Sequence, residues 1–164
     1  MQPAVTDSTI DPSIEAKAVM TKLSRSFMTA IAILSVAGVV ISAVSLQRHY
    51  AKSATSYCEF GQQFNCDIVN RSEYSSITGI PVAAIGIAGY GLLFTLSTLY
   101  RSRRETATRL PIFALVGMAF ALYLTYIEAH VLNTWCILCL ISLGLITIIT
   151  ALAAVMKLRL AQNH

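Results

Sequence analysis

The chain has 164 residues, of which 55% are hydrophobic and only 12% are charged. Soluble domains carry about twice that share of charged residues, so the composition excludes an ordinary water-exposed domain and predicts a protein of the lipid bilayer. The 12 Lys and Arg exceed the 8 Asp and Glu, which gives a net charge of +4. In a soluble chain this excess would suggest nucleic acid as a partner. Here the basic residues lie beside apolar segments, which indicates orientation in a membrane and no nucleic-acid partner.

Residues 1–26 form the first predicted segment, a tail followed by a lead-in helix. The first 13 residues contain turn formers and no sustained apolar period, whereas apolar residues recur at helical spacing from Ile14 onward. The polar lead is longer, and the apolar stretch after it more extended, than in a signal peptide. We therefore expect the first apolar stretch to be a membrane anchor that is retained.

Four uncharged apolar runs are each long enough to cross a membrane. They are Phe27–Leu46, Ile80–Leu99, Leu110–Ile127 and Trp135–Met156. Their 18 to 22 residues span a hydrocarbon core of about 30 Å, and backbone groups in lipid must bond within their own segment. Pro81 and Pro111 are expected in the first turns of the second and third helices, where a missing N–H costs nothing. The predicted fold is all-α, an integral membrane bundle of four transmembrane helices over residues 27–156.

The basic residues of the connections predict the orientation of this bundle. Nine of them lie before the first run, between the second and third runs and after the fourth, whereas three lie in the other connections. The positive-inside rule then places both termini, including the tail 157–164, in the cytoplasm. We expect a multi-pass protein of a bacterial inner membrane, with the loop 47–79 on the periplasmic side.

The loop 47–79 is the sizeable segment outside the predicted spans. It is too short to form a stable core of its own. Residues 67–77 mix apolar and polar side chains, which predicts a short helix at the membrane interface in this first extracytoplasmic loop.

Four cysteines occur as two pairs, Cys58-x7-Cys66 in the loop and Cys136-x2-Cys139 at the start of the fourth run. All four are expected on the outward side. Cys136 and Cys139 share one helix face, and the first turn of a helix favours a thiolate, so this pair is predicted to be redox-active.

Two alternatives stay open for these cysteines. The first is a pair of fixed structural disulfides, 58–66 and 136–139, but a bond between residues three apart closes too short a loop to stabilise the chain much. The second is a zinc site, against which the seven-residue spacing and the oxidising compartment both argue, so no metal is predicted. Under either alternative the chain would be a membrane scaffold or a metal-binding protein.

Three stretches resemble one known family, the vitamin K epoxide reductase family and in particular its microbial members. They are C-x7-C in the outer loop, SEYSSITGIPVAAIGIAGYG entering the second run and WCILC opening the fourth. The resemblance covers about residues 27–156 and implies a quinone-dependent thiol-disulfide oxidoreductase. Cys58 would exchange with a thioredoxin-fold partner, and Cys66 would pass electrons to Cys136. Cys139 would then reduce a quinone, either ubiquinone or menaquinone.

The resemblance also bears on the partner and the substrate. No thioredoxin domain follows residue 156, so the periplasmic or lumenal partner is expected in trans, and the outcome would be disulfide formation in exported proteins. Ser72, six residues after Cys66, matches a polar family position near the quinone. Leu143 stands where animal members have a tyrosine linked to substrate binding, which implies an unmodified quinone rather than vitamin K epoxide.

A quinone with an apolar tail requires a pocket between helices with aromatic walls. We expect these walls to come from Trp135, Tyr90, Phe94 and Tyr123. Glu128 and His130, at the outer end of the third run, are candidates for proton transfer beside the dithiol.

Overall fold

The computed structural model describes residues 12–50, 59–60, 64–77, 79–99 and 104–162. Its helical elements are α1 (Pro12–Tyr50), α2 (Cys66–Arg71), the 3-10 turn η1 (Glu73–Ser75), α3 (Val82–Thr98), α4 (Arg104–Ile127), the π-helical turn η2 (Glu128–Leu132) and α5 (Ile137–Gln162). Two short antiparallel pairs complete it: β1 (Glu59–Phe60) with β2 (Phe64–Asn65), and β3 (Ser76–Ile77) with β4 (Ile80–Pro81). The architecture is the all-α bundle that the sequence predicts.

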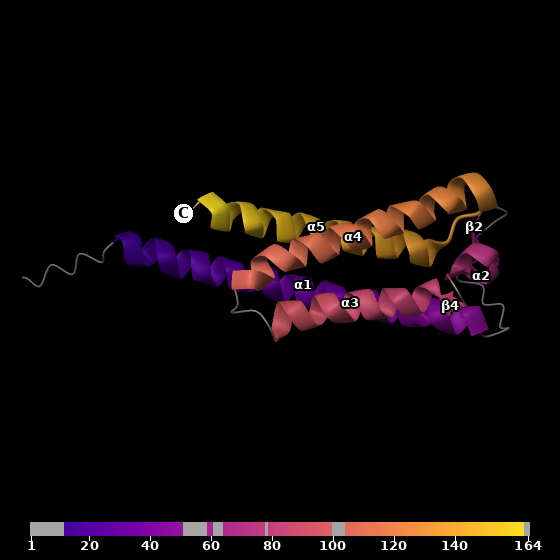
Figure 1. The fold of residues 1–164 in the computed structure, drawn as a ribbon, viewed down its shortest axis with the longest axis horizontal. Helices are drawn as coiled ribbons and strands as arrows, with labels where there is room; N and C mark the ends of the chain where they lie inside the picture. Colours follow the sequence, from indigo (N-terminus) through magenta and orange to yellow (C-terminus); the bar gives the residue numbers. More distant parts are fainter. Residues whose placement is uncertain (1–11, 51–58, 61–63, 78, 100–103, 163–164) are drawn as a thin grey trace, which may run out of the picture.

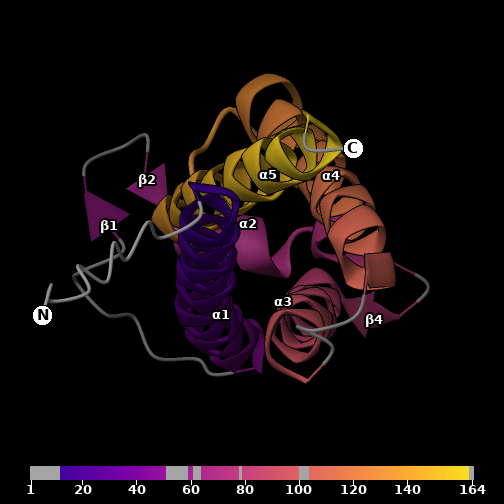
Figure 2. The same cartoon turned by 90° about the vertical axis from the view of Figure 1, so that its left-hand side faces the viewer.

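The four long helices form a ring when viewed from the end (Figure 2). Helix α1 packs against α3 and α5, and α4 packs against the same two helices from the other side. The short helix α2 lies at one end of this ring, beside the end of α4 and the start of α3 (Figure 1). The beginning of α1 and the end of α5 lie at the opposite end.

Among the residues that the structure describes, three helical segments are long and apolar enough to cross a membrane: Ser24–Tyr50, Thr108–Leu132 and Ile137–Arg159. Only 17 to 33% of the residues in their apolar windows are buried, so most of these side chains face outward and suit a lipid environment. The chain is therefore a multi-pass membrane protein. Helix α3 is apolar but has 17 residues, so its role as a fourth span stays a prediction.

The helix ends differ from the ends of the apolar runs. Helix α1 continues to Tyr50, four residues beyond the predicted end of the span, and α4 begins at Arg104. Pro111 consequently lies inside α4, and the expectation that it occupies the first turn was wrong. An apolar run marks the hydrocarbon layer, whereas backbone hydrogen bonding continues through polar residues at the membrane surface.

The extramembrane helix is also shorter than predicted. Helix α2 ends at Arg71, because Ser72 adopts an extended backbone conformation with φ −65° and ψ 158°. The chain then makes the turn η1 and the β3–β4 pair, in which Gly79 supplies a positive φ of 84°. This pair leads directly into α3, with Pro81 at its N-cap position.

The core of the bundle depends on a close approach of α1 and α3. Its buried cluster consists of Met28, Ile31, Tyr90, Leu93, Leu110, Ala114, Ile146, Ile149, Ala153 and Met156. Tyr90 of α3 lies directly over Gly38 of α1, where a Cβ atom would overlap the tyrosine ring. A glycine at position 38 therefore lets the two helices approach, as small residues do in membrane bundles.

Substitution of Gly38 by alanine should destabilise the bundle. The added methyl group would displace the Tyr90 ring, and overpacking of this kind costs about 1–3 kcal/mol. Thermal unfolding in detergent, followed by circular dichroism, should show a lower midpoint than that of the wild type. Gly144→Ala is the matched control, since nothing lies within 4 Å of a Cβ at that position. Equal midpoints for the two variants would contradict the packing described here.

Candidate functional site

Cys66 meets the Cys136–Cys139 pair at the end of the bundle where α2 lies. Strand β2 runs beside the segment that precedes α5, with a parallel bridge between Phe64 and Trp135. The backbone N–H of Asn65 donates to the carbonyl of Trp135 at 3.2 Å. Because Asn65 and Trp135 each immediately precede a cysteine, the pairing brings Cys66 and Cys136 into the same buried cluster. Both cysteines are completely buried.

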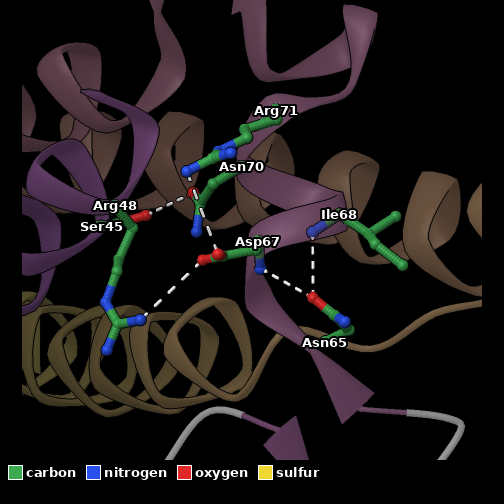
Figure 3. A network of polar contacts seen from close by, with 7 residues as sticks. All are labelled: Ser45, Arg48, Asn65, Asp67, Ile68, Asn70 and Arg71. Carbon is green, nitrogen blue, oxygen red and sulfur yellow. Dashed lines mark hydrogen bonds and ion pairs between the residues drawn. The ribbon is translucent and has the colours of Figure 1, made fainter. Parts of the chain in front are cut away.

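Local caps hold the six residues of α2 in helical form. The Oδ1 atom of Asn65 accepts hydrogen bonds from the N–H groups of Asp67 at 3.0 Å and Ile68 at 3.1 Å (Figure 3). At the other end, the hydroxyl of Ser72 donates to the carbonyl of Val69 at 2.8 Å. Such caps contribute about 1 kcal/mol each and matter most in a helix this short.

Polar contacts attach α2 to the end of α1. Ser45 donates to Oδ1 of Asn70 at 2.7 Å, and Arg48 lies 3.8 Å from Asp67 (Figure 3). His49 contacts the carbonyl of Asn70 through Nδ1. Arg48 is only 4% exposed, so removal of Asp67 would leave a buried charge without this counter-ion. These contacts fix the position of Cys66 relative to the bundle.

A largely apolar cavity of about 420 Å³ lies between the helices below α2. Its walls come from α1, α2, η1, α3, α4, η2 and α5. Three of the predicted quinone-site residues line it: Cys139, Tyr90 and Ser72. Its size and apolar walls suit an organic ring with an apolar tail.

The other predicted aromatic residues lie outside the described lining of the cavity. Phe94 is 40% exposed and Tyr123 is 55% exposed, both on outward faces of the bundle. Trp135 is half-buried and takes part in the site through its backbone carbonyl. Phe113 and Phe120 of α4 line the cavity in their place. A helix that is apolar all round gives no sequence signal that separates inward from outward aromatic residues.

Tyr90 joins two helices across the cavity wall. Its hydroxyl donates to the carbonyl of Ser142 at 2.9 Å and lies 2.9 Å from the Ser142 hydroxyl. The ring is buried against Gly38 of α1. Tyr90 therefore holds α3 against α5 one turn below Cys139.

Cys136 occupies the position that precedes α5, rather than the first helical turn that the sequence suggests. The Cys139 thiol hydrogen-bonds to its sulfur, and the backbone N–H groups of Cys139 and Leu138 also donate to it. These donors lower the pKa of the Cys136 thiol, although burial and the nearby Glu128 oppose them. A thiol in this environment is a good leaving group and a good nucleophile.

Glu128 lies beside the cysteine pair and is only 2% exposed. Its Oε2 atom accepts the backbone N–H of Cys136 at 3.0 Å, whereas Oε1 has no hydrogen-bond partner among the described residues. The π-helical turn η2 begins at Glu128 and ends at Leu132, and its C-cap residue Asn133 adopts a left-handed conformation with φ 49°. Single π-helical turns of this kind are frequent at functional sites.

Oxygen and sulfur ligands converge at this point. One atom each from Glu128, Cys136 and Cys139 lies within 4.8 Å of the other two. The spacing alone would allow a metal ion, but the described residues supply only three ligands here, one fewer than a tetrahedral structural zinc site has. We therefore do not identify the cluster as a metal site.

The three cysteines that the structure describes differ in state. Cys66 takes part in a disulfide, whereas Cys136 and Cys139 are free thiols. Cys58 lies outside the described residues. Within the part of the chain that the structure describes, an oxidised loop cysteine therefore faces a reduced dithiol.

Several residues of the site had no functional signal in the sequence. Arg48 is one of the three basic residues of the outward connections, and His49 follows it without any motif of its own, yet both contact α2. Asn70 stands out only in three dimensions, where its Nδ2 atom is buried without a partner among the described residues. Of the two proton-transfer candidates, Glu128 lies in the site, whereas His130 is exposed and stacks on Tyr126.

A family model of the vitamin K epoxide reductase family matches residues 29–154. The matched region contains all four cysteines, the cavity and Glu128. It covers more than half of the chain and confirms the resemblance that the sequence motifs indicate. The chain belongs to the vitamin K epoxide reductase family, whose members are membrane oxidoreductases that act on thiols and quinones.

Proposed function

We propose that this chain is a thiol:quinone oxidoreductase that passes electrons from a thioredoxin-fold protein, through its two cysteine pairs, to a quinone. The observation that carries the proposal is the Asn65–Trp135 backbone hydrogen bond. This hydrogen bond supports direct electron transfer from the sulfur of Cys66 to that of Cys136, because it brings the two cysteines into one buried cluster. Cys139, next in the path, lines the cavity.

The first half of the reaction is thiol–disulfide exchange. Cys58 is the remaining cysteine of the chain, so the proposal pairs it with Cys66. A thiolate of the partner attacks Cys58, and the second thiolate of the partner completes its own disulfide and releases Cys58. Cys66 then attacks Cys136 of an oxidised Cys136–Cys139 pair. Attack of Cys58 on Cys66 restores the loop disulfide and leaves the inner dithiol reduced.

The second half moves two electrons and two protons from the inner dithiol to a quinone. Cys136 and Cys139 lose two hydrogens and form a disulfide, and the quinone gains them and becomes a hydroquinone. The observed state, with Cys66 in a disulfide and Cys136 and Cys139 free, corresponds to the donor in this step.

The cavity is the proposed quinone site. Cys139 supplies the reacting sulfur, and Tyr90 and Ser72 form parts of the wall. Ubiquinone and menaquinone share the dione ring and the apolar tail that such a cavity accommodates. A part of the quinone that extends beyond the cavity would contact the three other predicted residues, Phe94, Tyr123 and Trp135.

The charge distribution supports a periplasmic location for the cysteines. The exposed bases Lys157 and Arg159 of α5 lie at the end of the bundle opposite the cysteine site. The positive-inside rule places that end in the cytoplasm. The proposal therefore includes an external thioredoxin-fold partner, supplied in trans, and disulfide formation in exported proteins as the outcome.

Purified protein, assayed with a reduced thioredoxin-fold donor and a panel of quinones, tests the proposed function. We expect oxidation of the donor with equal formation of hydroquinone. Protein that contains stoichiometric zinc, has unreactive thiols and reduces no quinone would instead be a metal-binding or scaffold protein.

Substitution of Cys139 by alanine should abolish quinone reduction, because the sulfur that lines the cavity is lost. Exchange between the partner and the loop pair should continue, since it does not require this sulfur. Quinone absorbance reports the first effect, and alkylation of the partner thiols followed by gel shift reports the second. Undiminished quinone turnover would contradict the role of Cys139.

Substitution of Cys58 by alanine should impair the reaction with the protein partner and spare the reaction with the quinone. Turnover with the protein partner should be lost, whereas quinone reduction driven by a small dithiol should persist, because Cys139 is partly exposed and needs no docking loop. The ratio of the two rates is the measurement. Equal loss with both donors would remove the distinction between an outer and an inner pair.

A further inference from the structure

Glu128 supplies the single carboxyl group among the described residues that line the cavity. We propose that this carboxylate accepts the proton of the Cys139 thiol and delivers it to an oxygen of the bound quinone. The inference rests on the proposed function and adds to it a catalytic acid–base residue. The sequence left Glu128 and His130 as equal candidates, so the choice between them comes from the structure.

The side chain of Glu128 is fixed on one side and free on the other. The backbone N–H of Cys136 donates to Oε2, which orients the carboxylate toward the cysteine pair. Oε1 is buried without a hydrogen-bond partner among the described residues. A buried carboxylate oxygen without a hydrogen bond is destabilising, so its persistence indicates a ligand or a proton as its partner during the reaction.

The donor atom is within reach of this carboxylate. A carboxylate oxygen of Glu128 and the sulfurs of Cys136 and Cys139 lie within 4.8 Å of one another. The single hydrogen of the Cys139 thiol, which points to the Cys136 sulfur in the arrangement described above, can alternatively be directed to the Glu128 carboxylate. Glu128 and Cys139 also both line the cavity, so the same carboxylate faces the thiol and the proposed acceptor site.

The fold places Glu128 there by a local change in the helix. Helix α4 ends at Ile127, and η2 continues it as a π-helical turn in which the backbone N–H of Asn133 donates to the Glu128 carbonyl. The N–H of Thr134 donates to the same carbonyl at 3.2 Å. The wider turn closes at Asn133 in a left-handed conformation, and the chain then reaches Cys136 within three residues. Glu128 thereby meets the backbone of the residue eight positions later.

The other titratable groups on the cavity wall already have other partners or belong to the reacting pair. His49 of α1 contacts the Asn70 carbonyl, and Tyr90 of α3 is bonded to Ser142. Tyr74 of η1 is 48% exposed, and Cys139 of α5 is the proton donor itself. His130 does not line the described cavity. Glu128 is thus the group with both a free oxygen and contact with the sulfur.

The protons and electrons of this step balance. Oxidation of the dithiol releases one proton from each sulfur, and formation of hydroquinone takes up one proton at each oxygen. Glu128 carries the proton of Cys139 and is regenerated when that proton reaches the quinone oxygen. The electron pair passes from the sulfurs, which end as the Cys136–Cys139 disulfide.

Glu128→Gln is the informative variant, because the amide oxygen can still accept the Cys136 N–H while the group no longer takes up a proton. Single-turnover reduction of a soluble quinone analogue by the prereduced protein should slow by about 10²-fold, the lower range for loss of general acid–base catalysis. The dependence of this rate on pH should flatten. Reduction of the loop disulfide by the thioredoxin-fold donor, which precedes the reaction of the inner pair, should still occur and reports that the variant is folded.

Two further variants make the result decisive. Glu128→Asp should restore part of the rate together with the pH dependence, and it carries the test if the glutamine variant fails to fold. His130→Gln, at an exposed position of the same turn, should behave as the wild type. Quinone reduction by Glu128→Gln at the wild-type rate and with the wild-type pH profile would overturn the inference, as would an aspartate variant without pH dependence.

The Cys139→Ala variant, assayed in parallel, separates this inference from the proposed function. If Cys139→Ala is inactive and Glu128→Gln is fully active, only the proton-transfer role fails. If Cys139→Ala also reduces quinone, the proposed function fails with it.

Discussion

The site depends on one backbone contact between segments that are 70 residues apart in the chain, the hydrogen bond from Asn65 to Trp135. A hydrogen bond between two backbone groups is insensitive to side-chain identity, but it sets the register of the neighbouring residues in both segments. Here the next residue in each segment is a cysteine, and both cysteines enter one dry cluster. The capped helix α2 and its contacts with α1 keep the loop in that register, so the cysteines meet without a core domain of their own.

Burial gives the two halves of the site different chemistry. Cys66 and Cys136 are both completely buried, which would protect the proposed exchange between them from competing thiols. Cys139 lies one helical turn further on and lines an apolar cavity, where a lipid-soluble oxidant fits. Glu128 connects these environments, because it bonds to the Cys136 backbone and also faces the cavity. In the proposed relay, Cys136 would receive electrons from the aqueous side and Cys139 would pass them to the lipid-soluble acceptor. The order of these two residues at the start of α5 would thus keep the donor and the acceptor apart.

The sequence predicts the parts of this structure that the bilayer imposes. Lipid forces apolar runs into helices, so the all-α bundle can be predicted directly. Cysteine spacing near a helix start indicates redox chemistry, and the reactivity of Cys136 and Cys139 stays a prediction. The residues that line the cavity cannot be predicted in this way. Phe94 and Phe120 are equally apolar, and only helix packing places Phe120 in the cavity wall and leaves Phe94 exposed. The π-helical turn and the long-range contact of β2 have no periodic signal in the sequence. Arg48, which counts as a surface base in the sequence, is buried because it reaches Asp67 across the end of α1.

The direct test of the account is to trap the bond between the loop and the bundle. In a Cys139→Ala background, Cys136 has no neighbouring thiol, and mild oxidation followed by alkylation and peptide mass spectrometry reports its partner. The account predicts a Cys66–Cys136 disulfide as the major product, formed within one molecule. A Cys136 thiol that is alkylated quantitatively, while Cys66 stays bonded elsewhere under conditions that turn over the wild type, would contradict it.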